Sequence, residues 1–98
     1  MNNSALHEAL CALLREAGRV HHQAFIEVDG DDPDWPLWYA GYLLERLRQQ
    51  LDPTLTRSQL VTDLVLAAED HAQTAPESDW AAHYARFLIM RHSGGSGR

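Results

Sequence analysis

The spacing of apolar residues along the chain predicts helices and no strands. In the first stretch, apolar side chains recur every three or four positions, which places them on one face of a helix. These positions are Leu6, Leu10, Leu13, Ala17, Val20, Ala24 and Val28. The same spacing returns three more times, and together the patterns predict helices over residues 4–28, 35–51, 57–74 and 76–92.

Each of the later helices has its own predicted apolar face. The second should bury Leu37, Ala40, Leu44, Leu47 and Leu51. The third should bury Leu60, Leu64, Ala67, Ala68 and His71. The fourth carries Trp80, Tyr84, Phe87, Leu88 and Arg91 at helical spacing. Gly18 interrupts the first helix at a cost of about 1 kcal/mol relative to alanine, so we expect a kink or a close helix contact there.

Stop and start signals separate the first two helices. Asp29 and Gly30 should end the first one, since glycine readily adopts the left-handed conformation that often follows a helix C-terminus. Two prolines prevent the loop that follows from continuing the helix. Asp34 is the expected N-cap of the second helix, with Pro36 tolerated in its first turn.

Capping patterns predict where the last two helices begin. In a capping box, a Ser or Thr side chain accepts a hydrogen bond from the backbone three residues on, and a Glu or Gln at that position reaches back. Thr56 and Gln59 fit this pattern, and Thr74 and Glu77 repeat it. Ser78 is an alternative cap if the fourth helix begins later.

The helices are expected to pack as one all-α domain. Short connections favour antiparallel neighbours, so a four-helix bundle with up-and-down topology is the default arrangement. Residues 1–92 would form this domain, and the Gly- and Ser-rich residues 93–98 a flexible tail. A chain of 98 residues, of which 45% are hydrophobic, is large enough to bury one core.

The charge of the chain argues against nucleic acid as a partner. The formal net charge is −6, with 8 basic residues against 14 acidic ones, so a basic surface that would neutralise phosphates is missing. Most of this net charge comes from one loop, which contains Asp29, Asp31, Asp32 and Asp34.

A single cysteine and the lack of long apolar runs favour a cytoplasmic protein. Cys11 has no partner for an intrachain disulfide. The longest apolar runs, such as residues 87–90, are far shorter than the roughly 20 residues of a membrane span. The N-terminal residues do not resemble a signal peptide. We therefore expect a soluble, cytoplasmic chain that binds no membrane.

Six histidines raise the question of a metal site. A carboxylate-bridged di-metal bundle uses Glu-x-x-His, and no glutamate of this chain is followed by a histidine three residues later. Two weaker possibilities stay open: His21, His71 and His83 could converge between helices, and His7 with Cys11 could hold a metal one turn apart. Histidines at the edge of the core, bonded to backbone or solvent, are the favoured interpretation, and no cofactor is predicted.

The acidic loop has the ligand chemistry of a calcium site but not its spacing. Carboxylate oxygens suit a hard cation. An EF-hand places a glycine after alternating acidic residues and a glutamate further on, whereas here Gly30 comes early and Pro33 interrupts the series. We expect helix capping and solvated charge in this loop, with weak cation binding as the alternative.

Four aromatic residues within eight positions are the most distinctive feature of the chain: Trp35, Trp38, Tyr39 and Tyr42. At about 100° per residue they span one broad side of the second helix, largely away from its leucines. Three roles fit this placement, namely locking the loop against the first helix, forming a protein or subunit interface, or lining a small-ligand pocket. Locking the loop is the favoured role.

The segment from Gly30 to Leu43 has the pattern G-x-D-P-x-W-P-x-W-Y-A-x-Y-L. It resembles a stretch found in small uncharacterised bacterial all-helical proteins and covers about a seventh of the chain. The resemblance implies a bacterial, cytoplasmic helical domain. It implies no activity and no functional residues.

The acidic loop and the aromatic segment are the predicted working surface. The candidate site residues are Asp31, Asp32, Asp34, Trp35, Trp38, Tyr39, Tyr42, His21 and His22. The leading interpretation is a noncatalytic interaction module that binds a protein partner, or a second copy of itself as a homodimer, through this surface. The alternative is a small enzyme or small-molecule-binding protein, with His21, His22 or His83 as acid–base groups.

Overall fold

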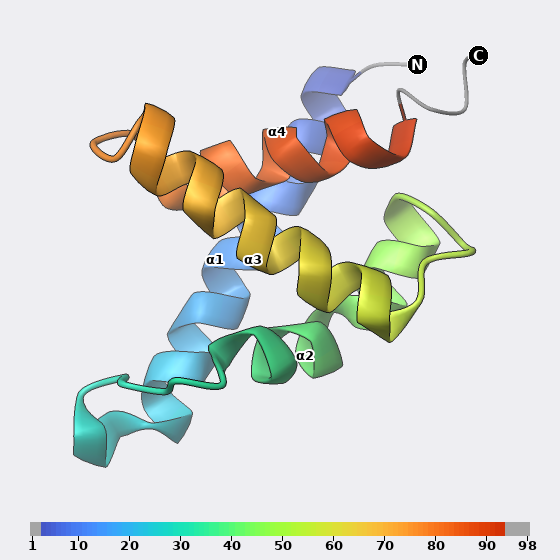
Figure 1. The fold of residues 1–98 in the computed structure, drawn as a ribbon. Coiled ribbons are helices and arrows are strands. Elements are labelled where there is room, and N and C mark those ends of the chain that lie inside the picture. Colours follow the sequence, from blue (N-terminus) through green and yellow to red (C-terminus); the bar gives the residue numbers. More distant parts are fainter. Residues whose placement is uncertain (1–2, 94–98) are drawn as a thin grey trace.

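The computed structural model describes residues 3–93, in which four α-helices pack against one another (Figure 1). They are α1 (Asn3–Ala24), α2 (Trp35–Gln50), α3 (Arg57–Thr74) and α4 (Trp80–Ser93), with a short 3₁₀ helix, η1 (Ile26–Val28), after α1. This part of the chain contains no strand, so the predicted all-α bundle is confirmed. Nearly all of the predicted tail lies outside the described residues. None of the described helices is both long and apolar enough to cross a membrane.

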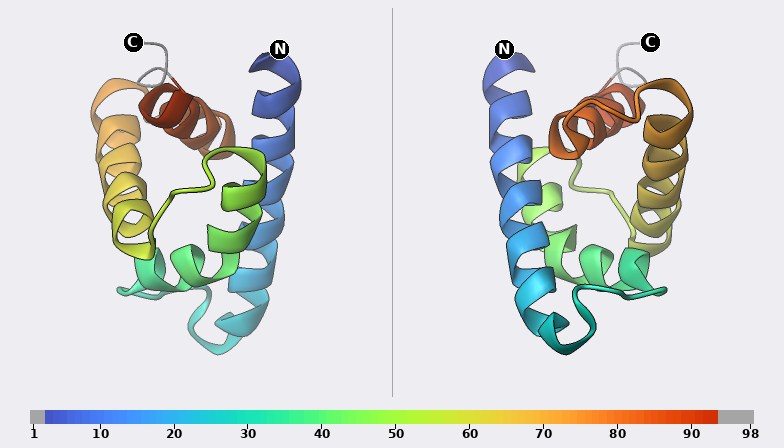
Figure 2. Two further views of the ribbon diagram at one scale, coloured as in Figure 1. Left: turned by 90° about the vertical axis from the view of Figure 1, so that its right-hand side faces the viewer. Right: turned by 90° about the vertical axis from the view of Figure 1, so that its left-hand side faces the viewer.

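Each helix contacts its neighbours in sequence, and α4 also contacts α1. The 22 residues of α1 extend over about 33 Å. Along α1, contacts with α4 run from His7, whose Nε2 lies 3.2 Å from the Ala82 carbonyl, to Gly18 beside Trp80, and the C-terminal half of α1 also meets α2. The helices cross at steep angles (Figures 1 and 2). This differs from the near-parallel alignment of the expected up-and-down bundle.

The core consists mainly of leucine and alanine side chains. The fully covered members are Leu10, Leu14, Ala17, Ala40, Leu43, Leu47, Leu55, Leu60, Leu64, Ala67, Ala81, Ala85 and Leu88. Burying one leucine stabilises the fold by roughly 1.5–3 kcal/mol. All four helices and the α2–α3 loop contribute, so the bundle depends on each of them.

The buried face of α2 differs from the predicted one. Ala40, Leu43 and Leu47 are fully buried, whereas Leu37 is 49% exposed. Leu37 lies about 200° around the helix from Trp35 and from Tyr39. Because these two aromatic side chains face the interior, Leu37 is turned outward, and its predicted place in the core was wrong.

The predicted face of α1 is also wrong at its C-terminal end. Ala24 is exposed and Val28 is 54% exposed. The buried side continues instead through His21 and the half-buried Phe25. The apolar pattern overran the helix, because the α-helix stops at Ala24 and the chain turns through η1.

The left-handed turn predicted at Asp29 and Gly30 is present, but it ends η1, whereas α1 already stops at Ala24. Asp29 and Gly30 both adopt left-handed conformations, with φ angles of 58° and 80°. The Gly30 N–H donates to the Phe25 carbonyl at 2.9 Å, which closes the turn. A Cβ at Gly30 would lie 3.0 Å from His22 Nδ1, so both the backbone conformation and the available space favour glycine there.

The capping box of α3 is confirmed, but the predicted start of α4 at residue 76 is wrong. The Thr56 hydroxyl accepts from Gln59 N, and Gln59 Oε1 accepts from Thr56 N. α4 begins only at Trp80, because Asp79 is its cap: the Asp79 carboxylate accepts from Ala82 N at 3.1 Å. Thr74 instead donates its hydroxyl to a carbonyl of the last turn of α3.

A buried carboxylate that the apolar pattern does not predict joins α3 to the end of α4. Asp63 is 2% exposed. It accepts a hydrogen bond from His92 Nε2 at 2.6 Å and forms an ion pair with Arg91, whose Nε lies 2.7 Å from Asp63 Oδ1. The other ring nitrogen of His92 donates to Asp52 at 3.0 Å. Two carboxylates and two basic side chains are thus partners at the edge of the core. A buried charged group needs such partners, because burying it alone would be costly.

Asp52 makes the stability of the fold depend on pH. Hydrogen bonds from the Thr54 hydroxyl and backbone N–H, and the nearby His92, lower the pKa of Asp52 below its ordinary value of about 4. A carboxyl with a depressed folded-state pKa stabilises the fold above its unfolded pKa, and this contribution is lost as the pH falls through the folded pKa. Asp52→Asn should therefore lower the melting temperature near neutral pH and flatten its fall below about pH 4. Circular dichroism melts over that range measure this; equal slopes for both proteins would contradict it.

Candidate functional site

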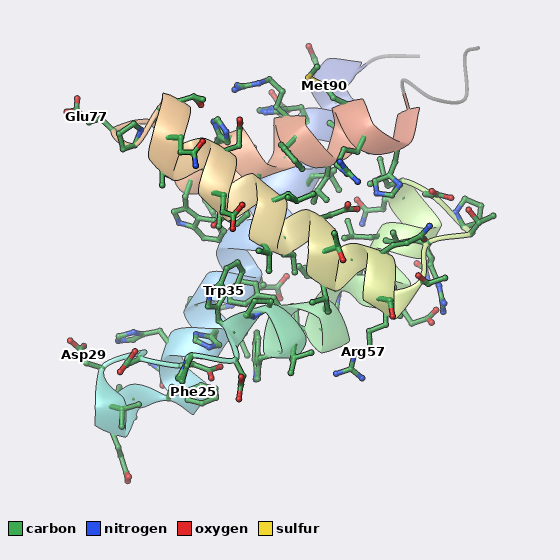
Figure 3. The ribbon with its side chains drawn as sticks, viewed as in Figure 1. Phe25, Asp29, Trp35, Arg57, Glu77 and Met90 are labelled. Atoms are coloured by element: carbon green, nitrogen blue, oxygen red, sulfur yellow. The ribbon has the colours of Figure 1, made fainter. Side chains whose placement is uncertain are left out.

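A cavity of about 350 Å³ lies where the acidic loop, the end of α1 and the starts of α2 and α4 meet. Its lining residues are His21, Gly30, Asp31, Asp32, Trp35, Tyr39, Trp80 and Tyr84. We call it the loop pocket. Figure 3 shows Trp35 at the start of α2, beside the loop that carries Phe25 and Asp29 at the far end of the molecule from Met90.

A buried pair, His21 of α1 and Asp32 of the acidic loop, holds the loop against α1. His21 Nε2 donates to Asp32 Oδ2 at 3.0 Å, and the two side chains are only 8% and 9% exposed. The second carboxylate oxygen of Asp32 accepts from the backbone N–H of Asp34 at 3.0 Å. Both oxygens are therefore used to hold the loop in place, and Asp32 fixes the wall of the loop pocket rather than projecting freely into it.

Aromatic rings hold His21 in turn. Its ring stacks on Phe25 at 4.6 Å between centroids, meets the edge of Trp38 at 4.9 Å and lies 5.2 Å from Tyr39. Such contacts fix the orientation of the imidazole. Locking of the loop against the first helix, which the sequence favoured for the aromatic segment, is consistent with this packing around His21.

The aromatic walls of the loop pocket stand at right angles to one another. Trp35 and Tyr39 are 5.7 Å apart at 88°, and Tyr39 and Trp80 are 6.4 Å apart at 89°. Trp80 and Tyr84 are 5.3 Å apart at 81°. Each ring is nearly perpendicular to the next, so these contacts are edge-to-face rather than stacked. Trp35 and Tyr39 come from α2, and Trp80 and Tyr84 from α4.

Gly18 gives two of these rings room beside α1, as its position inside the helix suggested. A Cβ at this position would lie 3.1 Å from Trp80 Cζ2 and 3.4 Å from the Tyr39 hydroxyl. The first distance is shorter than ordinary van der Waals contact. The close helix contact expected at Gly18 is therefore confirmed.

A matched pair of glycine substitutions tests this contact. A Cβ at Gly41, in the middle of α2, would meet only an arginine tip at 3.8 Å, so Gly41→Ala should stabilise the fold by about 0.5–1 kcal/mol through helix propensity. Gly18→Ala has the same propensity gain but must displace Trp80, and we expect it to be less favourable than Gly41→Ala by about 1 kcal/mol or more. Urea unfolding measures both. Equal gains would contradict the close contact.

Two of the residues that line the loop pocket, Asp31 and Asp32, are acidic. Asp31 is exposed, and Asp32 faces His21 at the wall. Burial raises the pKa of Tyr39, and burial together with the nearby Tyr39 raises the pKa of Tyr84. Both phenols therefore keep their protons near neutral pH. No lysine or arginine is among the lining residues.

The remaining predicted site residues lie outside the loop pocket lining. Trp38 and Tyr42 stack on each other at 5.4 Å on a neighbouring side of α2, and the Arg46 guanidinium covers the Tyr42 ring at 4.5 Å. Asp34 is exposed and contributes its backbone N–H to the loop. His22 is exposed beside the loop turn at Gly30.

The histidines considered as one metal set are not grouped as ligands. His71 and His83 lie 5.1 Å apart, and His83 donates to Asp70 at 2.7 Å, whereas His21 has Asp32 as its partner. Within residues 3–93 no three His, Cys, Asp or Glu side chains are placed to hold a metal ion. His83 lines a separate cavity between α3 and α4 rather than the loop pocket.

The His7 and Cys11 pair has the geometry of an edge contact. Cys11 Sγ lies 3.7 Å from His7 Nδ1. Burial raises the pKa of the Cys11 thiol, which keeps it protonated near neutral pH. A metal needs the thiolate, so this environment disfavours Cys11 as a ligand.

Comparison with known proteins returns no match: no protein-family model, no curated protein and no solved structure matches the chain. The resemblance of residues 30–43 to bacterial helical proteins therefore stays a prediction. What the loop pocket can hold has to be judged from its walls, its charge and its size.

Proposed function

We propose that the protein is a noncatalytic interaction module, and that a partner protein inserts one side chain or a chain terminus into the loop pocket. The observation that carries this proposal is the position of the cavity, at the junction of the acidic loop with Trp35 and Tyr39. Aromatic side chains with polar tips are enriched in protein interfaces. The loop pocket adds a concave anchor point, of the kind in which binding hot spots cluster.

The size and the fixed shape of the loop pocket support this function. About 350 Å³ is at the lower end of the range for ligand sites and suits one side chain rather than a large cofactor. The His21–Asp32 hydrogen bond already holds the loop in the free chain. A site formed before binding loses less conformational entropy when a partner docks.

Selection of peptides from a random displayed library on the immobilised chain tests the proposal even though the partner is unidentified. Selected peptides should bind Trp35→Ala at least about tenfold more weakly than the unmodified chain, because Trp35 is a wall of the loop pocket. Leu37→Ala is the matched control, since this exposed side chain lies on the opposite side of α2. Circular dichroism must first show that both variants are folded. Peptides that then bind Trp35→Ala as tightly as the unmodified chain would contradict the proposal.

A second copy of the chain is one form that the partner could take. Light scattering after size-exclusion chromatography gives the mass in solution. A dimer that Trp35→Ala converts to a monomer would assign the partner to another copy, whereas a monomer at all concentrations would exclude the homodimer and leave a different protein as the partner.

The second candidate is a small-molecule-binding protein or a small enzyme, and the His21–Asp32 pair favours it. A carboxylate that orients an imidazole beside a cavity is common to sites where histidine transfers protons. Neither His22 nor His83 lines the loop pocket, so His21 is the histidine placed for this role. Native mass spectrometry of the purified chain is the test: a small molecule retained by the unmodified chain and lost in Trp35→Ala would favour this candidate.

A further inference from the structure

We infer that the loop pocket is selective for an organic cation, an ammonium or guanidinium group carried on a short alkyl stem. This inference rests on the proposed binding function of the loop pocket and names the chemistry of what enters it. The group could belong to a free molecule or to a lysine or arginine of a partner, since both present the same cation.

The arrangement of the rings is the first argument. A cation is attracted to the face of an aromatic ring and not to its edge. Trp35, Tyr39 and Trp80 all line the loop pocket, and neighbouring rings lie at 88° and 89° to each other, so the rings around this space differ in orientation. Several aromatic side chains around one space are typical of the cages that bind quaternary ammonium groups.

The charge around these rings is the second argument. Asp31 and Asp32 both line the loop pocket. Asp31 is exposed, whereas Asp32 is held by His21 and by the Asp34 backbone. Asp31 is therefore the carboxylate free to turn toward a bound cation. An anion would instead meet two carboxylates, and repulsion disfavours it.

The alternative occupants fit less well. A bare metal ion needs several oxygen or nitrogen ligands, and no such group of three side chains occurs in the described part of the chain. A neutral alkyl group would gain contact with the rings but nothing from Asp31. The loop pocket is large enough for a trimethylammonium or guanidinium head with its stem, because about 350 Å³ exceeds the size of either head.

Titration with choline and with its uncharged isostere 3,3-dimethylbutan-1-ol tests the inference directly. The readout is the ¹⁵N–¹H signal of each tryptophan indole. Trp35 and Trp80 line the loop pocket and should shift, and Trp38, which does not line it, is the internal control. We expect choline to bind at least about tenfold more tightly than the isostere, because only choline gains the attraction of the ring faces and of Asp31. Asp31→Asn should weaken choline at least about threefold and leave the isostere unchanged.

The outcomes separate this inference from the proposed function. Equal affinity for choline and the isostere would overturn cation selectivity while leaving a working pocket. No shift of Trp35 or Trp80 with choline would also overturn it, and the peptide selection would then decide the proposed function on its own. Parallel titrations with n-butylguanidinium and with N-acetylarginine amide distinguish the source: tighter binding of the arginine derivative supports a cation supplied by a partner's side chain, and tighter binding of the free guanidinium supports a small molecule.

Discussion

Asp63→Ala is expected to lower the free energy of unfolding by about 3 kcal/mol, one of the two largest effects expected of a single substitution in this chain. The Asp63 side chain is 3% exposed, accepts a hydrogen bond from His92 and forms an ion pair with Arg91. Its removal leaves the largely buried His92 ring with one carboxylate partner fewer, and leaves a cavity in α3. Chemical denaturation followed by circular dichroism gives the difference.

The matched control for this substitution is Glu45→Ala. Glu45 also pairs with an arginine, Arg48, but its side chain is 73% exposed. Exposed pairs contribute little, so the loss should be below about 0.5 kcal/mol. If Asp63→Ala cost no more than Glu45→Ala, the Asp63 cluster would not stabilise the fold.

Leu43→Ala is expected to destabilise the fold by about 3 kcal/mol, because it removes a fully buried leucine and the surrounding helices relax only partly into the space. Leu37→Ala removes the same atoms from the same helix at a position that is 49% exposed. We expect it to cost less than about 1 kcal/mol.

The two leucines also test the orientation of α2. Urea unfolding of both variants gives the two costs on one scale. A larger cost at Leu37 than at Leu43 would mean that α2 is rotated to the face that its sequence pattern predicted, which would also turn Trp35 and Tyr39 away from the loop pocket.

Local signals predicted the helices well, because they depend on neighbours in sequence. The capping box at Thr56 and the left-handed turn at Asp29 and Gly30 act within a few residues and lie where they were predicted, although α1 itself ends earlier, at Ala24. The start of α4 was predicted too early, because the sequence offers Thr74 and Ser78 as its possible caps. The Asp79 carboxylate caps the helix instead.

The faces of the helices were harder to predict, because they depend on what packs against them. Leu37 and Val28 continued an apolar pattern yet lie exposed, whereas His21 and Asp63 look polar in sequence and are buried. Each of these two polar side chains has a charged or aromatic partner far along the chain, which periodicity does not detect.

The candidate site was predictable only in part for the same reason. His21, Asp31 and Asp32 were named with Trp35 and Tyr39 from one stretch of sequence, and the structure brings all five to the loop pocket. Two further walls, Trp80 and Tyr84, come from α4. Their spacing of one helical turn indicated a shared face, but only the packing of α4 on α1 places that face opposite the acidic loop.

Both proposals require the loop pocket to be formed in the free chain, and one measurement tests this most directly. Nuclear Overhauser effects should connect the rings of Tyr39 and Trp80, whose centroids are 6.4 Å apart, and those of His21 and Trp38, at 4.9 Å. We predict both sets in the unliganded protein, together with protection of the Gly30 amide from hydrogen exchange. Absence of the Tyr39–Trp80 contacts, with rapid exchange at Gly30, would contradict a preformed pocket.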